Sequence, residues 1–171
     1  YNHAVGSSVE PGSTFKLASI MALLEDDYVD LDDSIDIENG KTVFSDEEIQ
    51  MEDSSPYSGK IDSTSVRRIF EISSNVGTAK LIEKYYGTRN KINQNKGAEK
   101  FIERLKGFNL HLPTGIEIHG EVNPYIKEAY NREDQWSGIT LPWMATGYEL
   151  RMTPLQILAF YNAVANNGKM M

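Results

Sequence analysis

A serine and a lysine one helical turn apart, Ser13 and Lys16, are the residues of this sequence best suited to nucleophilic chemistry. They lie in the segment EPGSTFK, residues 10–16, and a mostly apolar run over 17–24 follows at once. The Pro-Gly pair interrupts any preceding element, so the pattern predicts a helix over about residues 13–26. In its first turn, unpaired backbone N–H groups and the positive end of the helix dipole favour negative charge beside the serine hydroxyl.

The predicted helix is apolar on nearly all sides, so we expect it to be buried. A lysine at the buried end of such a helix loses hydration, which lowers its pKa. A neutral Lys16 beside Ser13 is a base that can take the proton of a nucleophile. The apolar residues behind this expectation are Phe15, Leu17, Ala18, Ile20, Met21, Leu23 and Leu24.

The Ser-x-x-Lys pattern by itself is a weak signal. With 14 serines and 11 lysines among 171 residues it is expected about once by chance, and it occurs once. Three features of its context set it apart: the Pro-Gly pair before it, its place at a helix start, and a second polar motif further along the chain.

That second motif is Ser73-x-Asn75, which lies between two predicted helices, where a polar side chain can point into a cleft. One interpretation is structural: Ser73 or Ser74 caps the following helix, worth about 1 kcal/mol. The other is catalytic: a hydroxyl near Lys16 passes a proton to a leaving group, and the asparagine amide holds the lysine and orients an amide substrate. The two interpretations are compatible.

Residues 10–16 and the segment SSNVG at 73–77 together resemble the transpeptidase domain of class B penicillin-binding proteins, most of all the cell-division type similar to penicillin-binding protein 3. Such proteins carry the motifs S-x-x-K, S-D-N and K-T-G. Here Ser74 stands in place of the aspartate, as is common in this class. The likeness covers nearly the whole chain in order, and its further segments are PTGIE at 113–117 with Gly120-Glu121, Gly147-Tyr148, TPLQ at 153–156 and NNG at 166–168.

The resemblance implies a role for each motif residue. Ser13 attacks the carbonyl of the penultimate D-alanine of a peptidoglycan stem peptide and expels the terminal D-alanine. Lys16 takes the serine proton, Ser73 relays a proton towards the leaving amine, and Asn75 contacts the lysine and the substrate amide. An amine of a neighbouring stem then attacks the acyl-enzyme to form a cross-link, and a β-lactam acylates the same serine and stays.

The resemblance also implies surroundings and partners. Peptidoglycan stem peptides, β-lactam antibiotics and other division proteins are the expected partners. The expected location is the extracytoplasmic face of the bacterial cytoplasmic membrane, anchored by an N-terminal segment outside this sequence. The family needs no metal and no organic cofactor. His3, His111 and His119 are scattered and fit no metal-ligand spacing, so we expect surface or structural roles for them.

One departure from the family concerns the third motif. Neither Lys-Thr-Gly nor Lys-Ser-Gly occurs in the 171 residues. In the family this motif lies on a strand of the central sheet and supplies part of the oxyanion hole. We therefore expect residues 1–171 to be a partial transpeptidase domain, truncated before that motif. The expected fold class is mostly α as a fragment: the helical part of the β-lactamase/transpeptidase-like α/β fold, with most of the central sheet missing.

Two alternatives to a transpeptidase are considered: the first keeps the fold and changes the reaction, and the second is a different class of protein. A serine β-lactamase or D,D-carboxypeptidase shares the fold but resolves the acyl-enzyme with water. A non-catalytic penicillin-binding sensor module acylates without turnover or only binds a partner. No residue of the motifs marks a deacylating water, so the transpeptidase is preferred.

Composition narrows the function classes further. The formal net charge is −8, from 25 acidic and 17 basic residues, which argues against nucleic acid and anionic membrane surfaces as partners. The sequence has no cysteine, so neither disulfides nor thiol chemistry are available. It contains no apolar run of the length that spans a membrane.

Hydrophobic spacing and caps predict the elements that carry these motifs. Helices are expected over about 65–72 (capped by Ser63-Thr64, with Phe70 facing inward), 76–86, 98–106 (Phe101, Ile102 and Leu105 inward) and 154–167 (Thr153 as N-cap). An acidic stretch around 30–37 fits a half-exposed strand better than an EF-hand, because Ile35 and Lys41 stand where that loop needs Gly and Glu. Residues 1–12, 41–62 and 108–150 are expected to be mostly loops and short pieces.

Overall fold

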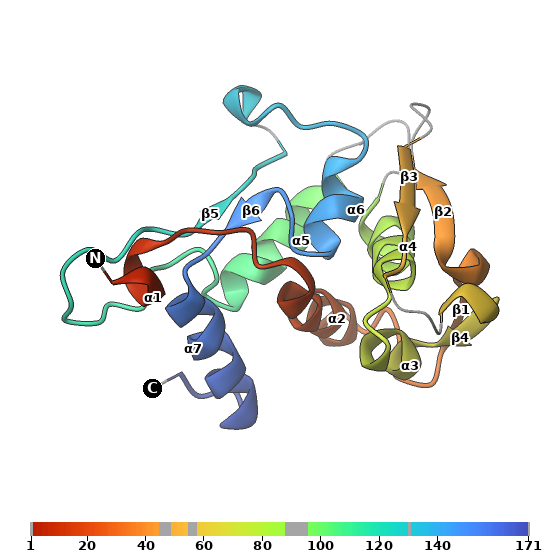
Figure 1. Cartoon of the computed structure of the whole chain (residues 1–171), viewed down its shortest axis with the longest axis horizontal. Helices are drawn as coiled ribbons and strands as arrows, with labels where there is room; N and C mark the ends of the chain where they lie inside the picture. Colours follow the sequence, from red (N-terminus) through yellow and green to blue (C-terminus); the bar gives the residue numbers. More distant parts are fainter. Residues whose placement is uncertain (1, 45–48, 55–57, 88–95, 130, 171) are drawn as a thin grey trace.

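Helices predominate in the computed structural model, which describes residues 2–44, 49–54, 58–87, 96–129 and 131–170 (Figure 1). The α-helices are α1 (His3–Gly6), α2 (Lys16–Glu25), α3 (Val66–Glu71), α4 (Asn75–Tyr86), α5 (Lys96–Gly107), α6 (Thr140–Ala145) and α7 (Pro154–Ala165). Single 3-10 turns are η1 (Gly12–Phe15), η2 (Glu38–Gly40), η3 (Ser58–Lys60) and η4 (Arg132–Asp134). The strands are β1 (Ser34–Asp36), β2 (Lys41–Phe44), β3 (Ile49–Glu52), β4 (Ser63–Ser65), β5 (Tyr125–Ile126) and β6 (Leu150–Arg151).

The core lies where α2, α4 and α5 meet. Ala18, Ala22 and Leu23 of α2 have no exposed surface, which confirms that this helix is buried. Helix α5 turns its predicted residues Phe101, Ile102 and Leu105 into the core. Helix α3 also packs on α2, so α2 is covered by three later helices of the chain.

Among the described residues the strands form three separate antiparallel pairs, β1 with β4, β2 with β3, and β5 with β6. An isolated bridge between Val9 and Met152 extends the β5–β6 pair towards the nucleophile segment. A broad central sheet is not present in this described part. The structure is thus the mostly helical part of the fold that the sequence predicts.

Two segments expected to be irregular contain regular structure. Helix α1 lies within residues 1–12, and the Asn2 side chain caps it by accepting the Ala4 N–H at 3.0 Å. Strands β2 and β3 lie within residues 41–62, where Phe44 and Met51 are buried. Their apolar positions are too few for an alternating pattern to stand out in the sequence, so pairing with each other, not propensity, makes these strands.

The helix before the second motif differs in detail from the prediction. Ser65 is its N-cap and accepts the Arg68 N–H at 3.2 Å, whereas Ser63 and Thr64 belong to β4. Phe70 is 39% exposed rather than inward, because α4 crosses on the side of Ile69.

Helix α6 arises in the stretch expected to hold loops and short pieces. Pro142 is tolerated there because it lies in the first turn, where its missing N–H has no helical partner.

Helix α7 begins as predicted. Thr153 accepts the Gln156 N–H at 3.2 Å, and the Gln156 side chain accepts the Thr153 N–H at 2.8 Å, which completes a capping box. The helix packs against α1. In Figure 1, α7 lies on one side of α2 and the strands β1, β2, β3 and β4 lie on the other.

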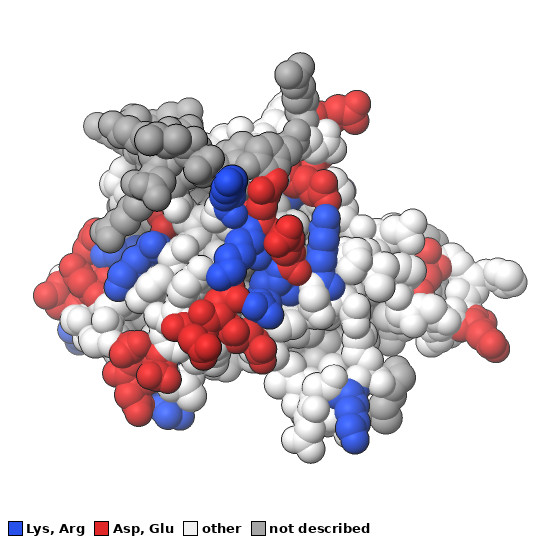
Figure 2. Space-filling model, turned by 180° about the vertical axis from the view of Figure 1, so that it is seen from behind, with Lys and Arg blue, Asp and Glu red and all other residues white. Residues whose placement is uncertain are grey.

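A buried carboxylate ties the end of α2 to α4 and α5. Asp26 has a side chain only 3% exposed, and it accepts hydrogen bonds from the Tyr86 hydroxyl and the Arg104 guanidinium. Burial opposes ionisation of Asp26, but these hydrogen bonds and the nearby cations outweigh it and lower its pKa. The face seen from behind in Figure 2 has acidic and basic side chains side by side near its centre.

We expect Asp26→Asn to lower the free energy of unfolding by about 2 kcal/mol at pH 7, because hydrogen bonds to a buried charge are lost. Since the folded-state pKa of Asp26 is lowered, its contribution is present above the ordinary pKa of 3.8 and disappears as the pH falls through the lowered value. Urea unfolding at pH 7 and in acid measures both effects.

Asp32→Asn is the matched control, since Asp32 has an 89% exposed side chain in an ion pair with Arg67. Equal losses in the two variants would show that the Asp26 cluster adds nothing to stability.

Candidate active site

Ser13 lies in the 3-10 turn η1, which leads directly into α2. The predicted helix start is confirmed in position, although its first turn is 3-10 rather than α. Gly12 has a φ of 55°, in the left-handed region that glycine enters at little cost. The Ser13 side chain is exposed, so a large substrate can reach it.

Lys16 is almost completely buried, with 1% of its surface exposed, and its ammonium group makes three hydrogen bonds. Its Nζ donates to the Ser73 carbonyl oxygen at 2.6 Å, to Ser73 Oγ at 3.1 Å and to Asn75 Oδ1 at 2.6 Å. Burial lowers the pKa of Lys16 to about 8, although the negative charge of Asp53 opposes the shift. The structure thus brings Lys16, Ser73 and Asn75 together and gives the lysine the lowered pKa that the sequence predicts.

The three acceptors of Lys16 differ in whether they can also donate a hydrogen bond to the neutral amine. A carbonyl and an amide oxygen can only accept, so they continue to hold two N–H groups of the amine. The Ser73 hydroxyl can turn round and donate to the lone pair of Nζ. Of these three partners, the Ser73 hydroxyl is therefore the one that can exchange a proton with Lys16.

The two neighbouring serines of the second motif divide the structural and chemical tasks. Ser74 is buried and caps α4, because its Oγ accepts the Gly77 N–H at 2.9 Å. Ser73 is exposed and has a φ of 55°, which ends α3 and turns its hydroxyl and carbonyl towards Lys16. Ser74 caps α4, so the Ser73 hydroxyl is not needed as a cap and can interact with Lys16.

Asp53, directly after β3, is a site residue that sequence reasoning missed. Its carboxylate accepts the Ser74 hydroxyl at 2.7 Å and the Val76 N–H at 2.8 Å, which pins the turn between α3 and α4. The carbonyl of Glu52 accepts the Asn75 Nδ2 group at 3.0 Å and so orients its Oδ1 towards Lys16. No pattern in the sequence marks Asp53, because it is 21 positions from the serine that it binds.

The nucleophile segment rests on the loop after α6. The Gly12 N–H donates to the Gly147 carbonyl at 3.0 Å, and Val9 pairs with Met152 through two backbone hydrogen bonds. A Cβ atom at Gly147 would lie 2.1 Å from the Gly12 carbonyl oxygen, so only glycine allows this approach. On the other side, the Tyr161 hydroxyl of α7 donates to the Thr14 carbonyl at 2.8 Å.

Within the described ranges, no three His, Cys, Asp or Glu side chains gather as metal ligands would. Of the helices described, none has both the length and the apolar character needed to cross a bilayer.

A helix-borne serine with a buried lysine one turn on, completed by a serine and an asparagine from an interhelical turn, agrees with the class predicted from the motifs. The whole chain, residues 1–171, matches the family described as the penicillin binding protein transpeptidase domain. The chain belongs to this family.

Individual relatives are similar over nearly all of this chain. Penicillin-binding protein PbpB of Mycobacterium tuberculosis is 32% identical over 173 aligned residues, which cover 98% of this chain and 22% of that protein. The probable peptidoglycan D,D-transpeptidase PenA of Neisseria gonorrhoeae is 28% identical, covering 98% of this chain and 25% of PenA. The crystal structure of penicillin binding protein 3 from M. tuberculosis, complexed with aztreonam, superposes with a TM-score of 0.75 at 28% identity.

That superposition covers 98% of this chain and 33% of the mycobacterial chain. The 171 residues therefore span between about a fifth and a third of the length of these relatives. The predicted likeness to penicillin-binding protein 3 is confirmed.

Proposed function

We propose that this chain provides the nucleophile of a peptidoglycan D,D-transpeptidase, with Ser13 as the attacking residue and Lys16 as its general base. The observation that carries the proposal is the Lys16 amine, which lies one turn after an exposed serine and is bound to Ser73 and Asn75, and whose pKa burial lowers to about 8. A base with a pKa near the working pH combines a usable neutral fraction with sufficient basicity.

The proposal implies the following reaction. Neutral Lys16 takes the proton of Ser13 while Oγ bonds to the carbonyl carbon of the penultimate D-alanine. The C–N bond to the terminal D-alanine then breaks, and its nitrogen receives a proton from Ser73 Oγ, which Lys16 replaces. An acceptor amine attacks the resulting ester and gives a proton to Lys16, and the Ser13 C–O bond breaks as Lys16 returns that proton to Ser13 Oγ. The products are a new amide cross-link and free D-alanine.

Relatives support the substrate and inhibitor class. The mycobacterial penicillin binding protein 3 has been solved with aztreonam and with ampicillin, and PenA is named as a peptidoglycan D,D-transpeptidase. We accordingly propose peptidoglycan stem peptides as substrates and β-lactams as acylating inhibitors. Other division proteins as partners, and an extracytoplasmic location with an N-terminal membrane anchor, belong to the same proposal.

The decisive experiment labels the full-length protein that carries these residues with a fluorescent penicillin. Ser13→Ala should abolish covalent labelling, whereas Ser63→Ala, at another exposed serine, should label like the parent. Mass spectrometry should place the adduct on Ser13. Labelling that persists in Ser13→Ala would refute the nucleophile assignment. Cross-linking of an added stem peptide then separates a transpeptidase from a hydrolase or a sensor.

The acylation rate should depend on pH through Lys16. Only the neutral amine can act as base, and with a pKa of about 8 roughly a tenth of it is neutral at pH 7. The rate should therefore rise as the pH increases and level off above about 8. Because the charge of Asp53 raises the pKa of Lys16, Asp53→Asn should move the midpoint to lower pH. Stopped-flow acylation between pH 6 and 10 measures this.

Asp62→Asn removes a charge from an exposed position and is the control for Asp53→Asn. A midpoint unchanged by Asp53→Asn, or a rate that falls with increasing pH, would rule out neutral Lys16 as the base.

The oxyanion hole needs donors beyond those of the nucleophile segment. We propose that residues 1–171 are a partial transpeptidase domain and that a Lys-Thr-Gly strand elsewhere in the protein completes the oxyanion hole. Removing one oxyanion donor typically costs about 10²–10³-fold in rate. The isolated 171 residues should therefore react with a fluorescent penicillin at least 100-fold more slowly than the full-length protein. Rapid stoichiometric labelling of the isolated chain would contradict this.

A further inference from the structure

The turn at 147–149, beside the nucleophile, holds two residues in the left-handed backbone region. The φ angle is 89° at Gly147 and 61° at Glu149. Glycine adopts such angles readily, but for glutamate they carry a conformational cost. A strained residue of this kind persists only where its surroundings hold it, and such residues cluster at functional sites.

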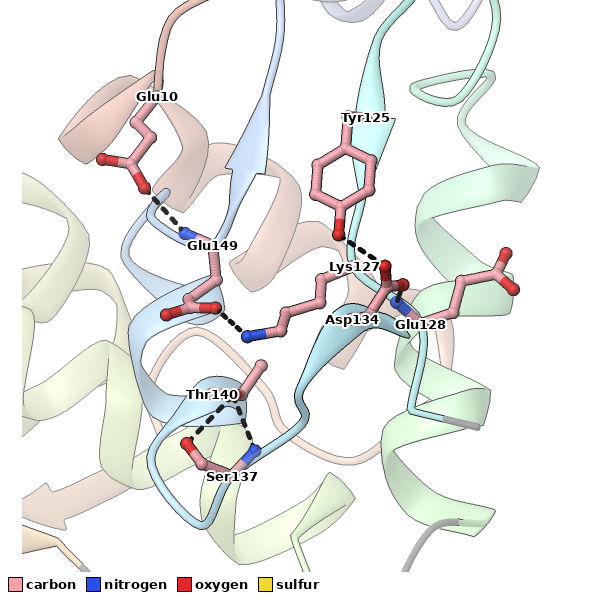
Figure 3. A network of polar contacts seen from close by, with 8 residues as sticks. All are labelled: Glu10, Tyr125, Lys127, Glu128, Asp134, Ser137, Thr140 and Glu149. Atoms are coloured by element: carbon pink, nitrogen blue, oxygen red, sulfur yellow. Dashed lines mark hydrogen bonds and ion pairs between the residues drawn. The ribbon is translucent and has the colours of Figure 1, made fainter. Parts of the chain in front are cut away.

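Two charged side chains hold Glu149 in place. Glu10 Oε1 accepts the backbone N–H of Glu149 at 3.1 Å, and Lys127 Nζ donates to Glu149 Oε2. The Lys127 side chain is only 12% exposed and that of Glu149 is 31% exposed, so this ion pair is partly shielded from water. Figure 3 shows Glu10 reaching the backbone of Glu149 and Lys127 reaching its carboxylate from a different segment.

Lys127 is itself carried on a fixed stretch of backbone. It follows β5, which pairs with β6 directly after Glu149. On the far side, Asp134 accepts the Tyr125 hydroxyl and the Glu128 N–H, each at 2.8 Å, so the backbone is held on both sides of the lysine (Figure 3). The ammonium group therefore approaches Glu149 from a defined position.

The 147–149 turn supports the nucleophile segment. Gly147 accepts the Gly12 N–H at 3.0 Å, and Gly12 directly precedes Ser13. Since the two backbones touch at this point, a shift of the 147–149 turn moves the residue before the serine. Lys16 is fixed independently by Ser73 and Asn75, so such a shift changes the place of the serine relative to its base.

We propose that Glu10, Lys127 and Glu149 are positioning residues that set the location of Ser13 relative to Lys16 through the 147–149 turn. This inference rests on the proposed serine acylation. None of the three side chains acts on the reacting atoms; they act through the contact between Gly147 and Gly12. Glu10 contributes most directly, because it lies three residues before the nucleophile and binds the strained residue itself.

The test measures acylation of the full-length protein by a fluorescent penicillin, with the covalent rate constant separated from the dissociation constant of the initial complex. Glu10→Ala should lower the rate constant about 10–100-fold, the range expected for a nucleophile misplaced by a fraction of an ångström to 1 Å. The dissociation constant should stay within about twofold. Glu10→Gln keeps an oxygen that accepts the Glu149 N–H, so it should restore the rate to within about threefold of the parent.

A second pair of variants tests the strained backbone. Glu149→Ala and Glu149→Gly both lose the ion pair with Lys127, but only glycine fits a φ of 61°. Glu149→Ala should therefore acylate more slowly than Glu149→Gly. Lys106→Met is the control, because it removes an exposed ion pair with Glu128 that does not touch the turn.

Each outcome bears on the inference. A parental rate constant in both Glu10→Ala and Glu149→Ala, or an equal loss in Glu10→Gln and Glu10→Ala, overturns it. So does a loss that appears only as fewer labelled molecules at an unchanged rate, since that reports a smaller folded fraction. A parent protein that does not label at Ser13 overturns the proposed function, and this inference with it.

Discussion

Lys16→Met should lower the rate of Ser13 acylation by about 10²–10⁴-fold, the usual contribution of a general base. Methionine is similar in length and apolar, so it fills the buried position of the lysine without providing a base. The serine keeps its place at the start of α2. The acylation rate constant, measured with a fluorescent penicillin on the full-length protein, should fall while the protein remains folded.

Stability must be measured with the rate, because Lys16→Met leaves the Ser73 carbonyl and Asn75 Oδ1 without this donor. An unpaired acceptor costs about 1–3 kcal/mol when it is fully buried and less at these partly buried positions, and thermal unfolding measures the loss. Lys41→Met is the matched control: Lys41 is a 63% exposed side chain paired with Glu52 on the β2–β3 pair. A Lys16→Met protein that is folded and acylates at the parental rate would show that another group takes the serine proton.

Gly147→Ala should have the second large effect, and it should act on both stability and acylation. At a φ of 89° an alanine is strained, and its Cβ would lie 2.1 Å from the Gly12 carbonyl oxygen. Because both atoms belong to backbone or are fixed to it, the nucleophile segment must move. We expect the free energy of unfolding to fall by about 2–4 kcal/mol, and the acylation rate to fall by about 10²-fold.

Gly168→Ala is the control that separates backbone strain from the collision with the Gly12 carbonyl oxygen. Gly168 has a φ of 79° at the end of α7, and a Cβ there would meet no atom within 4 Å. This control carries the backbone strain without the collision, so it should lose about 1–2 kcal/mol and acylate normally. If both alanine variants behave alike in stability and in rate, the close approach of Gly147 to Gly12 has no influence on the nucleophile.

Features that depend on neighbouring residues could be predicted from the amino-acid sequence. The start of η1, which leads into α2, follows from the Pro-Gly pair, and the start of α7 follows from the capping box of Thr153 and Gln156, because both signals lie within one turn of the helix start. The burial of Phe101 and its neighbours in α5 follows from helical spacing. The nucleophile and base were predicted for the same reason: Ser13 and Lys16 are one turn apart on a helix whose apolar surface must be buried.

The residues that complete this pair come together only in the folded chain. Asp53 pins the turn of the second motif and Gly147 supports the nucleophile segment, yet each is distant in sequence from its partner. The division between Ser73 and Ser74 also depends on a single left-handed residue, which turns one hydroxyl to the lysine and leaves the other to cap α4. Strands β2 and β3 exist because they pair with each other. Such features are contacts between distant segments, and no local propensity or spacing encodes a contact that forms only when the chain has folded.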